Sequence, residues 1–153
     1  MRTKTMNFFT QISAPIEKVF DTIADMPKYG EWLPDSSAFG GTADVFPYPV
    51  QLGTRYRDIG PVEKPGMVTE FVRPRCIAFH HVVLIRKPLK TDVDAKVRYT
   101  LEPTAEGVSV ERVLTVEYDL HFPLSSLAPF VLQGFRKENE RTLDALKRHL
   151  EAR

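Results

Sequence analysis

The sequence has a single cysteine, Cys76, so no disulfide can form within the chain. It also lacks a hydrophobic run near the roughly 20 residues that a membrane-spanning helix requires, and its N-terminal stretch MRTKTMNFFTQISAP has no apolar signal-peptide core. Neither sign of charge is in excess, because 21 basic side chains stand against 20 acidic ones. These absences argue against a nucleic-acid partner and an integral membrane segment, and we expect a cytoplasmic protein.

Metal-binding patterns are lacking as well. His80 and His81 are adjacent, so on a strand they face opposite ways and cannot ligate one ion together, and neither His121 nor His149 has a carboxylate at metal-ligand spacing. We therefore expect no metal and no cofactor. At 153 residues, with 42% hydrophobic side chains and no internal repeat, the chain has the size of one domain spanning residues 1–153.

The beginning of the chain predicts a strand followed by two short helices. Residues 4–12, KTMNFFTQI, hold the β-favouring residues Phe and Thr, and Pro15 is typical of a first helical turn. The apolar residues that follow recur at the spacing of one helix face: Ile16, Val19, Phe20 and Ile23. A second, shorter helix is expected between Asp25 and Pro34, with Pro27 in its first turn.

The middle of the chain predicts strands, and its end predicts a long helix. Segments of β-favouring residues bounded by Gly or Pro cover residues 42–46, 54–59, 67–72, 77–85, 93–101 and 108–118. From residue 123 to 153 the apolar residues follow the helical period instead. This order predicts an α+β fold, because short hairpins favour an antiparallel sheet that curls around the C-terminal helix.

Five segments stand in a characteristic order over nearly the whole chain: SAPIEKVFDTIADMPKYGEWLP, LGTRYR, VTEFVRPRCIAFHH, VRYTLEPTAEGVSVERVLTVEY and FRKENERTLDALKRHLE. Their combination resembles the SRPBCC superfamily, and more narrowly its polyketide cyclase/dehydrase and lipid-transport group, relatives of START domains. The resemblance implies a helix-grip fold, in which a seven-stranded antiparallel sheet curls around a long C-terminal helix. It also implies two short helices after the first strand and an apolar cavity beneath them.

The resemblance leaves the function open. Members of the superfamily cyclise and dehydrate polyketides, carry lipids and quinones, bind hormones or act with chaperones, and no catalytic signature is shared by all of them. LGTRYRDIG is a poor match to the long glycine-rich loop of the branch related to the birch pollen allergen. This mismatch argues against a hormone-type ligand.

Alternation along the expected strands indicates which side chains face the cavity. The inward candidates, taken from the more apolar parity of each strand, are Tyr56, Phe79, His81, Tyr99, Arg112 and Leu114. Asp58 shares the parity of Tyr56, and we hypothesise that it pairs with Arg112, since an unpaired inner charge is costly. Alternatively, Asp58 begins the turn at Gly60, and Arg112 reaches water from the end of the sheet.

His81, Arg112 and Asp58 are the candidate catalytic residues. An inward-facing His81 could act as general acid or base next to a ligand carbonyl, and Arg112 could orient a carboxylate, enolate or carbonyl. The alternative for His81 is a hydrogen-bonded residue of the cavity wall.

Aromatic and apolar residues of the helices are expected to close the cavity. The candidates are Tyr29, Trp32 and Leu33 over one end, and Phe130, Val131 and Phe135 of the long helix on the opposite wall, where Gly134 would leave room. The alternative is that these residues make ordinary contacts between helix and sheet.

The sequence favours the binding or carriage of a small, largely apolar ligand that is lipid-, aromatic- or polyketide-like. One alternative is a cyclase or dehydratase in which His81, Arg112 and Asp58 transfer protons and stabilise an oxyanion. Another is a protein-interaction module. Binding is preferred because the candidate catalytic groups are few and scattered, and we expect the chain to act as a monomer or homodimer.

Overall fold

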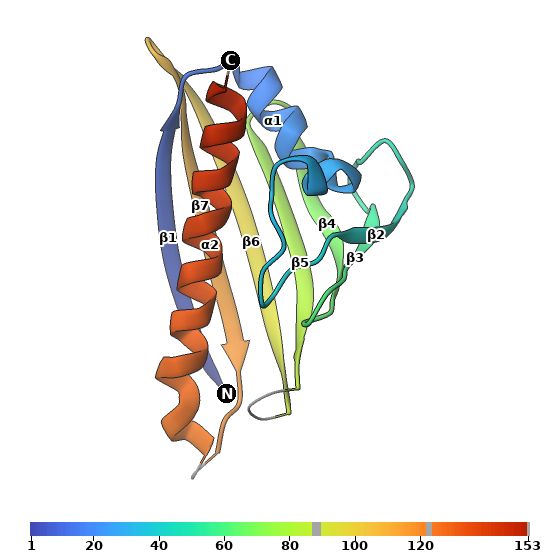
Figure 1. Cartoon of the computed structure of the whole chain (residues 1–153), viewed down its shortest axis with the longest axis vertical. Coiled ribbons are helices and arrows are strands. Elements are labelled where there is room, and N and C mark those ends of the chain that lie inside the picture. Colours follow the sequence, from blue (N-terminus) through green and yellow to red (C-terminus); the bar gives the residue numbers. More distant parts are fainter. Residues whose placement is uncertain (87–89, 122–123, 153) are drawn as a thin grey trace.

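The computed structural model describes residues 1–86, 90–121 and 124–152 (Figure 1). Helices are labelled α, or η where they are 3-10 helices, and strands are labelled β. In chain order the elements are β1 (Arg2–Ile12), α1 (Ile16–Ala24), η1 (Met26–Glu31), β2 (Thr42–Phe46), β3 (Arg55–Asp58), β4 (Lys64–Val72), β5 (Cys76–Ile85), β6 (Thr91–Thr104), β7 (Gly107–Tyr118), η2 (Leu124–Leu127) and α2 (Ala128–Glu151).

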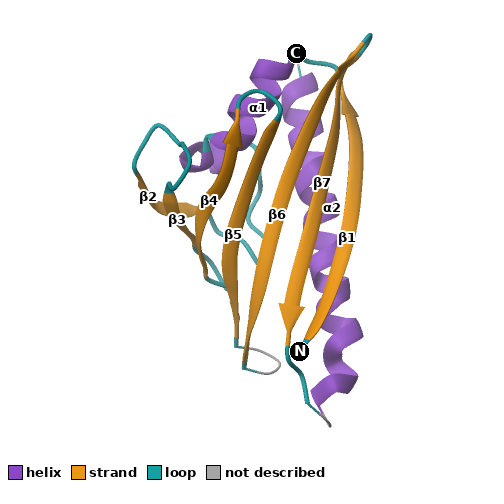
Figure 2. Ribbon diagram, turned by 180° about the vertical axis from the view of Figure 1, so that it is seen from behind, coloured by secondary structure: helices purple, strands orange, loops and turns teal. Residues whose placement is uncertain are grey.

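The strands form one antiparallel seven-stranded sheet in the order β1-β7-β6-β5-β4-β3-β2. Consecutive strands from β2 to β7 are neighbours, and β1 closes the order by pairing with β7 along its whole length. All helices lie on one face of the sheet, with α2 running along it and α1 and η1 at one end (Figures 1 and 2). The predicted helix-grip fold is confirmed, including the two short helices after the first strand.

The helix predicted between Asp25 and Pro34 is the 3-10 helix η1. The helical period from residue 123 onward covers two elements, the turn η2 and the helix α2, which begins at Ala128 with Pro129 in its first turn. No side chain caps α1; instead the backbone N–H of Ser13 donates to the Glu151 carboxylate in the last turn of α2, 2.9 Å away. The end of α2 therefore holds the connection between β1 and α1.

The core lies between the concave face of the sheet and the helices. Alternate residues of β6 and β7 are buried, as the strand period requires: Val93, Ala95, Val97, Tyr99, Leu101, Val108, Val110, Leu114 and Val116. The predicted stripe of α1 packs on this face, where Phe20 meets Phe71 edge to face with ring centroids 5.3 Å apart. Each large apolar side chain buried in this way contributes about 1.5–3 kcal/mol to stability.

The two halves of α2 pack differently. Apart from Ala128 in the first turn, its buried residues lie from the middle of the helix onward: Asn139, Thr142, Leu143, Leu146 and Leu150. In the first half, Val131, Leu132 and Phe135 are only half-buried. Tight packing therefore fixes the C-terminal half of α2, while its N-terminal half lies more loosely over the sheet. Within the described ranges, no helix is both long and apolar enough to cross a membrane.

Two glycines give a matched test of the fold. A Cβ at Gly107, where φ is +142°, would stand 2.1 Å from the Ile12 carbonyl oxygen, whereas a Cβ at Gly134 would meet no atom within 4 Å. We expect Gly107→Ala to lower the free energy of unfolding by about 3 kcal/mol and Gly134→Ala to raise it by about 0.5–1 kcal/mol. Chemical denaturation measures both, and equal effects would contradict the packing of β1 against the β6–β7 turn.

Candidate functional site

A cavity of about 60 Å³ lies between the sheet and η1. Its walls come from η1, β3 and the adjacent strands β5, β6 and β7, and its lining residues are Met26, Tyr29, Tyr56, Asp58, Phe79, His81, Val97, Tyr99 and Arg112. The structure thus brings the three candidate catalytic residues to one cavity. Strand alternation places them there, because each lies at an inward position of its strand.

Arg112 is held in place by residues of the cavity and of α2. Its Nε donates to Asn139 Oδ1 at 2.6 Å, its Nη1 donates to the Tyr99 hydroxyl, and its guanidinium carbon lies 4.9 Å from the centroid of the Tyr99 ring. Asn139 is itself fixed, because its side-chain amide donates to the Phe135 carbonyl at 2.7 Å. The guanidinium therefore faces the cavity from a fixed position.

Asp58 lies at the end of β3 and accepts a hydrogen bond from Thr42 Oγ1 at 2.8 Å. Burial raises the pKa of this carboxyl, while Lys64, Thr42 and Arg112 act in the opposite direction. No ion pair joins Asp58 to Arg112 among the described residues, so the hypothesis of a direct pair needs correction. The two side chains share the cavity, but Asn139 and Tyr99 are the partners of the arginine.

Lys64 is a charged residue of this region that the sequence reasoning missed. It stands directly opposite Asp58 in the pairing of β3 with β4. Its Nζ donates to the Ala38 carbonyl at 3.0 Å and lies 5.7 Å from the centroid of the Phe39 ring. Burial lowers the pKa of Lys64, although Asp58 and Glu138 counteract this. The segment GPVEKPG reads as a turn, and no signal in it shows that its lysine points inward.

His81 makes its contact with Tyr56, whose hydroxyl lies 3.1 Å from Nδ1. Burial, together with the positive charges of Lys64 and Arg112, lowers the pKa of His81 to about 3. The imidazole is therefore neutral across the physiological range. A base whose conjugate acid is this strong takes a proton from carbon poorly, so the environment of His81 suits hydrogen bonding better than proton abstraction.

The segment of residues 29–33 after α1, called the elbow here, contributes one residue to the cavity and two to the core. Tyr29 lines the cavity, and its hydroxyl donates to the Ile23 carbonyl. Trp32 and Leu33 are buried but do not line the cavity. Trp32 packs edge to face on Tyr29 at 5.0 Å and lies nearly parallel to the His149 ring at 6.4 Å. Trp32 thus joins the elbow to the end of α2.

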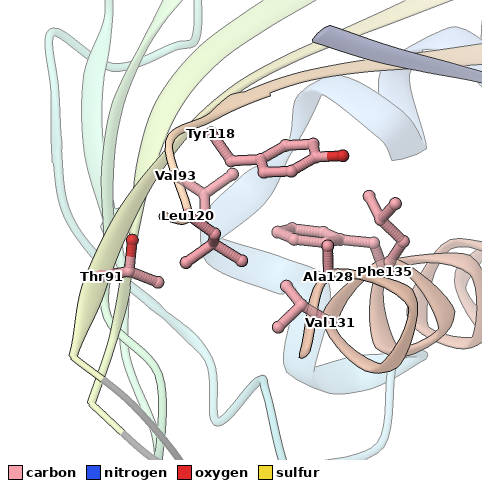
Figure 3. Close-up of a pocket in the computed structure, with 8 residues that line it drawn as sticks. Thr91, Val93, Tyr118, Leu120, Ala128, Val131 and Phe135 are labelled. Carbon is pink, nitrogen blue, oxygen red and sulfur yellow. The ribbon is translucent and has the colours of Figure 1, made fainter. Parts of the chain in front are cut away.

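The remaining predicted residues lie outside the cavity. Leu114 is buried on the inner face of β7. Val131 and Phe135 line a second, smaller hollow of about 10 Å³ between the start of α2 and the end of the sheet, which Figure 3 shows with Tyr118 and Leu120. Phe130 is 67% exposed, because its position in the first turn of α2 points away from the sheet. Gly134 faces open space and does not make room for a ligand.

Metal ligands do not gather in this site. Across residues 1–86, 90–121 and 124–152, no three His, Cys, Asp or Glu side chains come close enough to hold an ion. The chemistry that the site offers is therefore hydrogen bonding and charge, from one guanidinium, one carboxyl group and the hydroxyls of Tyr29, Tyr56 and Tyr99.

Comparison with known proteins gives a family and a fold. Residues 5–151 match the family described as "Polyketide cyclase / dehydrase and lipid transport". Protein CV1439 from Chromobacterium violaceum is a similar solved structure, with a TM-score of 0.69 and 17% identity over 97% of this chain and 99% of that one. A START superfamily protein from Mycobacterium smegmatis gives a TM-score of 0.65 and 15% identity over 97% of each chain.

A third similar structure is the di-domain ARO/CYC StfQ from the steffimycin biosynthetic pathway. Its TM-score is 0.75 and its identity 10%, over 97% of this chain and 51% of that one. At such low identities the similarity shows the fold alone. No protein of curated function matches the sequence.

The low pKa of His81 predicts how stability depends on pH. The unfolded chain takes up a proton at His81 near pH 6.5, whereas the folded chain does so only near pH 3. Between these values His81 makes the free energy of unfolding fall by about 1.4 kcal/mol for each unit that the pH drops. We expect His81→Gln to remove this slope in denaturation curves between about pH 4 and 6. His121→Gln, which changes an 84% exposed side chain, should keep it; an unchanged slope in His81→Gln would show that the imidazole is not buried neutral.

Proposed function

The chain belongs to the polyketide cyclase/dehydrase and lipid transport family, and we propose that it binds a small, largely apolar ligand whose polar group contacts Arg112. The observation that carries this proposal is the guanidinium held on the inner face of the sheet, within a mostly apolar and aromatic wall. A fixed arginine beside apolar surface suits a ligand that combines a carbon skeleton with one carbonyl, enolate or carboxylate oxygen.

The charges around the cavity support a ligand with a negative or electron-rich oxygen. Arg112 and Lys64 carry positive charge, and Asp58 is the acidic residue that lines the cavity. His81 contributes no charge, because its pKa is about 3. The Arg112 guanidinium donates to Asn139 and Tyr99, and among the described residues no carboxylate forms an ion pair with it, so an anionic ligand group would neutralise its charge.

The walls support an apolar, preferably aromatic skeleton. Phe79 meets both Tyr56 and Tyr99 edge to face, with centroid distances of 5.9 and 6.4 Å. Val97 and Met26 complete the apolar surface. Rings in such an arrangement offer faces and edges to a planar ligand, and the hydroxyls of Tyr56 and Tyr99 add polar atoms next to His81 and Arg112.

An acid–base enzyme is the second candidate function. The arrangement that favours it is the placement of Asp58, with a raised pKa, in the same cavity as Arg112. A buried carboxyl group with a raised pKa holds its proton more readily than an exposed one and can take part in proton transfer, and a guanidinium stabilises a developing oxyanion. Of the two predicted acid–base residues, Asp58 fits this role better than His81, whose conjugate acid is too strong.

Ligand charge gives the direct test of the binding proposal. We expect calorimetry to show that Arg112→Gln lowers the affinity for naphthoate by about 10- to 100-fold, because a charge-assisted hydrogen bond is lost, and leaves the affinity for methyl naphthoate nearly unchanged. Arg98→Gln is the matched control, since Arg98 lies on the outer face and pairs with Glu70 at 2.8 Å. Equal losses for both probes, or loss in the control, would contradict the role of Arg112.

Proton exchange separates binding from catalysis. If the protein is a binder, it leaves the rate of deuterium exchange at the acidic carbon of an aryl β-diketone at the solvent rate, as followed by NMR. If it is an enzyme, it accelerates the exchange and Asp58→Asn abolishes the acceleration, whereas His81→Gln has a small effect because the imidazole is a weak base. We expect the first result.

A further inference from the structure

The side chains that hold Arg112 carry no charge. Its Nε donates to Asn139 Oδ1 at 2.6 Å, and its Nη1 donates to the Tyr99 hydroxyl. A guanidinium removed from water is usually paired with a carboxylate, but among the described residues no carboxylate forms an ion pair with this one. The amide and the hydroxyl therefore stabilise the positive charge without cancelling it.

The carboxylates of this region are engaged elsewhere. Glu138 directly precedes Asn139, but its carboxylate pairs with Arg141 at 2.7 Å. Glu111 directly precedes the arginine in β7 and lies on the outer face of the sheet, where it accepts from a side chain of β1 at 3.0 Å. Asp58 lines the cavity, but its carboxyl group accepts from a threonine of β2 at 2.8 Å. Asn139 thus occupies a place beside the guanidinium that a carboxylate could take.

Asn139 is suited to this place because its amide has two different ends. Oδ1 accepts from Arg112, while Nδ2 donates to the Phe135 carbonyl, one turn earlier in α2, at 2.7 Å. Asn139 is 4% exposed, so little water competes for either end. A carboxylate here would bring a negative charge and no donor for the Phe135 carbonyl. The asparagine therefore gives the arginine an acceptor of fixed direction and no charge.

The third nitrogen of the guanidinium, Nη2, faces accessible space. No described residue accepts a hydrogen bond from it, whereas every buried side-chain nitrogen or oxygen in the described part of the chain has a partner. Nη2 is therefore not buried, and the space beside Arg112 is the cavity that it lines. An oxygen of a ligand in this cavity would meet a donor that still carries its charge.

We propose that Asn139 is a specificity-determining residue for the charge of the ligand. It holds Arg112 through a neutral acceptor, so the positive charge is left for an anionic ligand oxygen such as that of a carboxylate or an enolate. Asn139 does not line the cavity and acts through the arginine. A carboxylate in its place would take the charge, and the site would lose its preference for an anion. This inference rests on the proposed function, because it concerns the ligand of the same cavity.

Calorimetry with Asn139→Asp tests this role. We expect the affinity for naphthoate to fall by about tenfold or more, because the introduced carboxylate pairs with Arg112, and the affinity for methyl naphthoate to change by less than about threefold. Thr142→Val is the matched control, since Thr142 lies in the same buried stripe and its hydroxyl donates along the helix to the Glu138 carbonyl at 2.7 Å. This control should leave both affinities nearly unchanged.

Two results of this titration would overturn the inference and leave the proposed function standing. One is an equal loss for both probes in Asn139→Asp, which is the mark of a residue that only shapes the helix. The other is an unchanged affinity for naphthoate in that variant.

The pH dependence of unfolding tests the same contact without a ligand. Beside Arg112, the carboxyl introduced by Asn139→Asp should have a lower pKa in the folded chain than in the unfolded one. The stability that it contributes is then present at neutral pH and lost as the pH falls below about 4. In an Arg112→Gln background, burial should raise that pKa instead, so the carboxyl costs stability at neutral pH and the cost disappears as the pH falls. Asp58 and His81 titrate in both members of each comparison, so their contributions cancel.

We expect opposite slopes in the two backgrounds. Slopes of the same sign would show that position 139 does not act on the charge of Arg112, and the inference would fail even where naphthoate binds. If the slopes are opposite but the wild-type protein binds naphthoate no more tightly than Arg112→Gln does, the proposed function fails and this inference fails with it.

Discussion

The structure depends on the way in which one guanidinium is satisfied beneath the sheet. Removing the Arg112 charge from water would cost several kcal/mol without partners, and Asn139 and Tyr99 supply them. Asn139 is 4% exposed and lies in the buried stripe of α2, which is apolar apart from Asn139 and Thr142. Asn139 fixes the position of α2 along the sheet. Its side-chain oxygen must accept from Arg112 of β7 while its side-chain nitrogen donates to the Phe135 carbonyl.

The cavity follows from this arrangement. Side chains that must present hydrogen-bonding atoms in fixed directions cannot interdigitate as closely as aliphatic ones. The apolar rows of β6 and β7 are buried wherever α1 and the second half of α2 cover them. The hollow occurs where Arg112 interrupts the row of β7 and where Asp58 of β3 and His81 of β5 face the same space. His81 is neutral mainly because it is buried, and the positive charges of Lys64 and Arg112 lower its pKa further. The polar character of the cavity therefore comes from Arg112, Asp58 and the tyrosine hydroxyls.

The inward-facing residues of the cavity could be predicted from the sequence, because successive side chains of a strand point to opposite faces of the sheet. Alternation placed Tyr56, Phe79, His81, Tyr99 and Arg112 on the inner face, and the structure gathers them at one cavity. Lys64 escaped prediction because its direction depends on the register of Asp58 against Lys64 in the β3–β4 pairing and on the distant Ala38 carbonyl. The positions of Trp32 and Phe130 depend on where α2 begins and ends, and the helical period of the sequence locates those ends only to within about one turn.

Stability and the polar site lie in different parts of the molecule. The pairings of β1 with β7 and of α2 with the elbow around Trp32 join segments from opposite ends of the chain. The cavity lies to one side of these contacts, and its central charge is held by hydrogen bonds from Arg112 to Asn139 and Tyr99. Because large apolar side chains supply most of the stability of such a core, a polar substitution at the cavity can change what the site binds while the sheet and its helix stay folded.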